Sequence, residues 1–73
     1  MEANTNIIIT CRAGSRVKAY RITAGEFCRV MWDTDCDGML PADYSELPLS
    51  ERLSEALKRE AEAYGGTCSY TIV

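Results

Sequence analysis

The 73-residue chain predicts a small α+β fold, a three-stranded and mainly antiparallel sheet with two helices on one face, in the order β-β-α-α-β. Three observations support this fold class. Ile7-Ile8-Ile9-Thr10 is a β-branched run typical of a strand, residues 51–64 repeat apolar side chains at helical spacing, and residues 67–73 alternate at the strand period. The length predicts one domain over residues 1–73.

The first two strands are predicted over residues 6–12 and 16–22, as a hairpin, because residues 13–15 between them are turn formers. The first strand is apolar on both faces, which favours a central position in the sheet. The second strand alternates imperfectly, which favours an edge strand with one exposed face. One of its faces carries Arg16, Lys18, Tyr20 and Ile22.

A first helix is predicted from Ala24 to about Trp32, because Thr23 and Glu26 fit a capping box in which each side chain binds the other residue's backbone amide. A strand over residues 27–32 is the alternative. The following stretch, residues 33–49, contains two prolines and four aspartates and is predicted to be irregular.

The second helix is predicted over residues 51–64, with Ser50 as its N-cap and Gly65-Gly66 at its end. The last strand, residues 67–73, is expected to pair with the first strand and to complete a sheet of order 2-1-3. Its alternation places Cys68, Tyr70 and Ile72 on the inward face.

The charges are unevenly distributed along the chain. Residues 1–30 have a net charge of +3 and residues 31–73 a net charge of -6. Such a dipolar chain favours an acidic surface that binds a basic partner protein. The expected partner-binding residues are Trp32, Asp33, Asp35, Asp37, Asp43, Tyr44, Glu46, Glu51 and Glu55, with Glu62 nearby.

Residue composition argues against catalysis. The chain has no histidine, the usual general base and metal ligand, and it has no nucleophile motif or phosphate loop. We therefore expect no enzyme activity and no cofactor. The four cysteines lack C-x-x-C spacing and are expected to be free, buried thiols, because neither a signal peptide nor a membrane span is indicated and cytoplasmic proteins rarely hold disulfides.

A calcium site is the first alternative function. Asp33, Asp35 and Asp37 alternate before Gly38, and Met39 follows with a carbonyl, as in the first half of an EF-hand loop. The second half does not fit, because Pro41 and Tyr44 occupy positions that should supply ligands.

Nucleic-acid binding is the second alternative. Arg16, Lys18 and Tyr20 alternate along one strand, and Arg12 lies across the hairpin, so these residues are expected to form a basic face with one aromatic ring. The isoelectric point near 4.8 opposes this function.

In its size, acidity and α+β composition, the chain resembles the small phage-encoded inhibitors of host defence, anti-CRISPR proteins among them. The resemblance covers the whole chain but no specific motif. It implies a non-catalytic inhibitor or modulator of a nucleic-acid-binding protein, acting in the host cytoplasm. An open edge on the last strand would in addition permit a homodimer.

Overall fold

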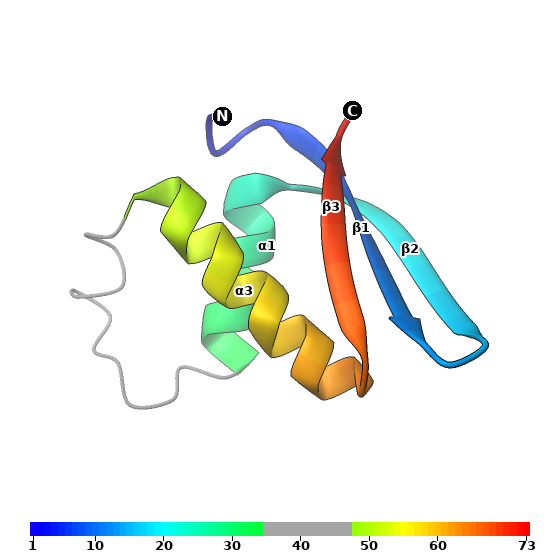
Figure 1. Cartoon of the computed structure of the whole chain (residues 1–73). Coiled ribbons are helices and arrows are strands. Elements are labelled where there is room, and N and C mark those ends of the chain that lie inside the picture. Colours follow the sequence, from blue (N-terminus) through cyan, green and yellow to red (C-terminus); the bar gives the residue numbers. More distant parts are fainter. Residues whose placement is uncertain (35–47) are drawn as a thin grey trace.

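A computed structural model describes residues 1–34 and 48–73 and confirms the predicted α+β fold (Figure 1). The elements follow in the expected order β-β-α-α-β. Their bounds are β1 Asn6–Ala13, β2 Arg16–Thr23, α1 Ala24–Thr34, α3 Leu49–Tyr64 and β3 Thr67–Ile72.

The sheet has the order β2-β1-β3, and both pairs of neighbours are antiparallel. This confirms the central position of β1 and the edge position of β2. Ile7, Ile9 and Cys11 on β1 are completely buried, whereas Ile8 between them is 38% exposed. The apolar run therefore covers a core on one face only, and the other face of the sheet is open in the part of the chain that the structure describes.

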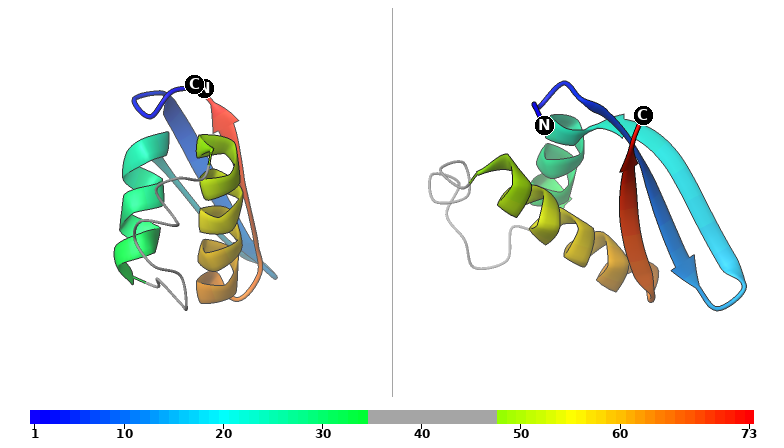
Figure 2. Two further views of the ribbon diagram at one scale, coloured as in Figure 1. Left: turned by 90° about the vertical axis from the view of Figure 1, so that its left-hand side faces the viewer. Right: turned by 45° about the horizontal axis from the view of Figure 1, so that its top comes forward.

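Both helices lie side by side on the inner face of the sheet and run in the same direction (Figure 2). α1 over residues 24–34 confirms the predicted helix and excludes the alternative strand over residues 27–32. The core joins Phe27 and Cys28 of α1 to Leu53 and Ala56 of α3 and to the inward side chains of β1.

The amino end of α1 is capped partly by the N-terminal segment of the chain. The Thr23 hydroxyl accepts a hydrogen bond from the amide of Glu26 at 3.2 Å, which is one half of the predicted capping box. The Glu26 carboxylate instead accepts from the Arg29 guanidinium. The remaining amides of this first turn, those of Ala24 and Gly25, donate to the carbonyls of Thr5 and Ala3.

The prediction that Ser50 caps the second helix was wrong. Helix α3 begins at Leu49, and its N-cap position is Pro48, which provides no side-chain hydrogen bond. The amides of Glu51 and Arg52 donate to the backbone carbonyl of Pro48. Because the proline ring restricts φ, the backbone itself starts α3, two residues earlier than a serine cap at Ser50 would.

The two glycines after α3 have different roles. Gly65 adopts the left-handed conformation, with φ of 83°, and the Ala61 carbonyl accepts from the amides of both Gly65 and Gly66. Gly66 lies directly against β1, so that a Cβ placed on it would overlap the carbonyl oxygen of Arg12. The close approach of this turn to β1 lets β3 enter the sheet at once.

The expectation of free thiols was wrong for two of the four cysteines. Cys11 and Cys68 are direct partners across β1 and β3, their Cα atoms are 4.2 Å apart, and a disulfide joins them. The antiparallel register brings facing side chains within disulfide distance in any cellular compartment. The prediction of free thiols was based on the compartment and could not anticipate this pairing. Cys28 is buried, as expected, and Cys36 lies outside the described residues.

We predict that Gly66→Ala lowers the free energy of unfolding by about 3 kcal/mol or more, because the new methyl group must displace the end of β1. Denaturant unfolding followed by circular dichroism measures this. Gly14→Ala is the control, since no atom of the described residues lies near the Cβ position of Gly14, and its positive φ should cost only about 1 kcal/mol. Equal losses for the two variants would contradict the close contact.

We also predict that peptide mapping of protein prepared without reductant recovers Cys11 and Cys68 in one linked peptide pair. The disulfide closes a loop with a sequence separation of 57 residues. Its reduction should lower the free energy of unfolding by about 2–4 kcal/mol, because the open chain gains conformational freedom when it unfolds. Complete alkylation of both cysteines without reductant would be inconsistent with the bond.

Candidate binding surfaces

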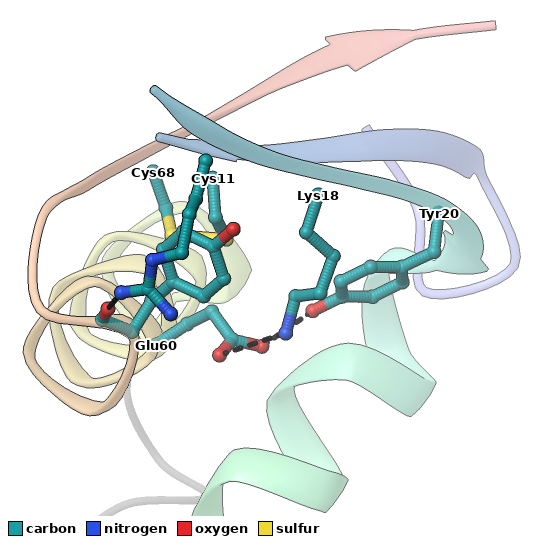
Figure 3. Close-up of polar contacts among 7 residues, drawn as sticks. Cys11, Lys18, Tyr20, Glu60 and Cys68 are labelled. Carbon is teal, nitrogen blue, oxygen red and sulfur yellow. Dashed lines mark hydrogen bonds and ion pairs between the residues drawn. A yellow bond between two sulfur atoms is a disulfide. The ribbon is translucent and has the colours of Figure 1, made fainter. Parts of the chain in front are cut away.

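A polar cluster joins the hairpin to the second helix (Figure 3). Glu60 of α3 is a buried charged residue, only 8% exposed. The Tyr20 hydroxyl of β2 donates to Glu60 Oε2 at 2.6 Å, and Lys18 Nζ lies 3.6 Å from Oε1. Both oxygens of the carboxylate therefore have a partner, which offsets the cost of removing its charge from water.

The same strand also contacts the carboxyl end of α3. Arg16 Nη2 donates to the backbone carbonyl of Tyr64 at 3.2 Å, where the helix leaves carbonyls without partners. The Arg16 guanidinium carbon and Lys18 Nζ lie 4.9 Å and 5.2 Å from the centre of the Tyr64 ring. Arg16 and Lys18 thus stabilise the packing of the hairpin against α3.

Burial, together with the hydrogen bond and the nearby charge of Glu60, holds the pKa of the Tyr20 phenol well above its ordinary value. Each of these causes opposes the phenolate, since a second negative charge would lie beside the Glu60 carboxylate. Tyr20 therefore remains a neutral hydrogen-bond donor over the physiological pH range.

The strand register divides the residues expected to bind nucleic acid between the two faces of the sheet. In the β1–β2 register Arg12 faces Val17, so Arg12 belongs to the opposite face of the sheet from Lys18 and Tyr20. The predicted basic face of Arg12, Arg16, Lys18 and Tyr20 is therefore not continuous. Arg16 and Lys18 contact α3 instead, while Arg12 and Arg21 lie on the open face.

The expected acidic surface is described only in part. On α3, Glu51 and Glu62 are exposed and Glu55 is half-buried, and within the described part of the chain none of the three has a cationic partner. Trp32 and Asp33 occupy the last turn of α1. The other predicted residues lie outside the described residues: Asp35, Asp37, Asp43, Tyr44 and Glu46.

Two features qualify this acidic surface. Because α1 and α3 run in the same direction, Asp33 at the end of α1 and Glu51 at the start of α3 lie at opposite ends of the helical layer (Figure 2). A surface hollow of about 180 Å³ on α3 is lined by both signs of charge, namely by Glu55, Lys58, Arg59 and Glu62. The exposed carboxylates of α3 are therefore distributed along the helix among cations.

Over residues 1–34 and 48–73 no group of three side chains is placed to hold a metal ion. Of the calcium candidates, Asp33 lies in α1, whereas Asp35, Asp37 and Met39 lie outside the described residues, so the calcium hypothesis stays a prediction. Among the described helices, none is long and apolar enough to cross a membrane.

Sequence reasoning missed the buried position of Glu60. Its spacing was the available signal, because Glu60 follows Leu53, Ala56 and Leu57 at the helical interval that marks the inward stripe. A carboxylate on an apolar stripe requires polar partners, and Tyr20 on the imperfectly alternating strand supplies one.

Comparison with models of known families, with curated proteins and with solved structures finds no match for this chain. Its class is thus defined by the fold alone, a small α+β domain with a one-sided helical layer.

We predict that Tyr20→Phe lowers the free energy of unfolding at neutral pH by about 1–3 kcal/mol, because the buried Glu60 carboxylate loses a donor. In the wild type the phenol pKa is higher in the folded than in the unfolded chain. The contact is therefore fully stabilising below about pH 10, the ordinary phenol pKa, and its contribution falls as the pH rises further.

Denaturant unfolding between neutral and strongly alkaline pH measures this difference. Tyr70→Phe is the matched control, since Tyr70 is on the exposed edge of the sheet. The gap in stability between the wild type and Tyr20→Phe should narrow at alkaline pH. A gap that is independent of pH would show that the phenol does not face the carboxylate.

Proposed function

We propose that this chain is a non-catalytic protein-binding module that inhibits or modulates a nucleic-acid-binding protein through an acidic surface. The carrying observation is a set of carboxylates on α3. Glu51, Glu55 and Glu62 have no cationic partner among the described residues.

Unpaired carboxylates on a helix held rigidly against a sheet form a surface of fixed geometry. Spaced negative charges of this kind imitate the phosphates of a nucleic acid and fit a basic groove that normally holds one. In the sequence, Asp33 at the end of α1 and the acidic residues within 35–46 add further negative charge before α3.

The proposed class, a small inhibitor of host defence of the anti-CRISPR kind, follows from this surface together with the size of the chain and its lack of histidine. Its proposed place of action is the host cytoplasm. The Cys11–Cys68 disulfide is a point against this location, because disulfides that are exposed to cytoplasmic reductants are rare.

The proposal is tested by capturing partners from a lysate of the native host and titrating the captured protein with two variants. The first variant is Glu51→Gln, Glu55→Gln and Glu62→Gln, which should weaken binding by about tenfold or more, because the groove loses its charge partners. The identified partner should also release the chain when its own nucleic acid is added.

The matched control adds three lysines to the open face of the sheet: Asn6→Lys, Val17→Lys and Ala19→Lys, all at exposed positions. Both triple variants change the net charge from -3 to 0, so net charge alone cannot separate them. Equal weakening by both, or none by the glutamine variant, would refute the acidic surface. Binding that disappears with a calcium chelator would support the calcium alternative instead.

A further inference from the structure

β3 is an edge strand without a single charged residue. Thr67–Ile72 reads TCSYTI, and Val73 follows it. The other edge strand, β2, carries Arg16, Lys18 and Arg21. Charged side chains on an edge prevent pairing with a further strand, so β2 is protected in this way and β3 is not.

The register shows which backbone groups of β3 face away from β1. The Val73 amide donates to the Asn6 carbonyl at 3.1 Å, so Val73 and Asn6 form a hydrogen-bonded pair. Hydrogen-bonded and non-hydrogen-bonded pairs alternate along an antiparallel ladder. The N–H and C=O groups of Cys68, Tyr70 and Ile72 therefore point to the free edge of the sheet.

The side chains at this edge are apolar and accessible. Tyr70 is 38% exposed and Ile72 56% exposed, although the register places both on the same face as the buried Ile9 and Ile7. Among the described residues, the helical layer covers this face of β1 completely and packs against Cys68 on β3, but it leaves Tyr70 and Ile72 accessible. Within residues 1–34 and 48–73, backbone groups without partners and an apolar strip thus coincide on one edge.

From these observations we propose that β3 pairs with β3 of a second copy of this chain, antiparallel and centred on Tyr70. The three outward residues are symmetric about Tyr70. Tyr70 then pairs with Tyr70 of the second copy. Cys68 of each copy pairs with Ile72 of the other. Each of these pairs is hydrogen-bonded in both directions, because the backbone groups of all three residues face the edge.

The resulting sheet has six strands in the order β2-β1-β3-β3-β1-β2. Its two-fold axis passes between the Tyr70 pair and is perpendicular to the sheet, so the contact is isologous and closes. Both helical layers lie on the same side, and Ile72 of each copy covers the Cys11–Cys68 disulfide of the other.

Charge and symmetry favour a second copy over an extended peptide of another protein. The uncharged strand offers a foreign peptide no ionic recognition, whereas its own sequence supplies matching apolar side chains on one face. The disulfide ties β3 to β1 and holds the edge in its paired conformation beforehand, which lowers the conformational entropy lost on association.

The test is sedimentation or light scattering of the oxidised full chain over a range of concentrations. The wild type should reach twice the chain mass of 8.1 kDa. Tyr70→Lys should be monomeric at concentrations where the wild type is dimeric, because two ammonium groups would meet at the axis. Ile72→Pro should have the same effect, since it removes an outward amide that β1 does not use.

Val17→Lys is the matched control, because Val17 is 54% exposed on the other edge strand, and this variant should remain dimeric. Amide hydrogen exchange reports the register directly: the amides of Cys68, Tyr70 and Ile72 should gain protection as the concentration rises. A wild type that stays monomeric at millimolar concentration would overturn the proposal. So would a dimer that leaves these amides unprotected.

Discussion

Ile7, Ile9 and Cys11 face the helical layer and are completely buried, while Ile8 between them reaches solvent. Side chains alternate along a strand, so a shift of one residue in either pairing of β1 would expose all three and bury polar neighbours. This one-sided burial therefore determines the register of both β2 and β3. The register in turn places Arg12 on the open face, brings Tyr20 toward α3 and sets Cys68 opposite Cys11.

The second constraint is the buried carboxylate of Glu60. An unpaired charge at this depth would cost several kcal/mol, so α3 can pack here only when Tyr20 and Lys18 reach the two oxygens. Any sliding of the helix along the hairpin breaks these contacts, whereas apolar contacts tolerate small shifts. The polar cluster therefore specifies one position of α3 on the sheet, and Gly66 then brings the following turn against β1.

The fold was predictable because its signals are local. The apolar spacing of α3, the Thr23 cap, the Gly65 terminus and the run of isoleucines all act within a few residues. Two of the errors concern pairs that are distant in sequence. Cys11 meets Cys68 and Tyr20 meets Glu60 only because two registers and a helix packing bring them together. The start of α3 was misplaced because a proline can begin a helix without a side-chain cap.

The two proposals reinforce each other through symmetry. A two-fold axis perpendicular to the sheet keeps both helical layers on one side, so Glu51, Glu55 and Glu62 of the two copies face the same direction. A single α3 has cations among its carboxylates and offers a weak acidic surface. Two copies joined at β3 present that surface twice at a fixed spacing, and the second contact then forms at a high effective concentration. A dimer would thus offset the modest charge of each helix by presenting two helices. Such a dimer requires the edge of β3 to stay uncharged and open to pairing.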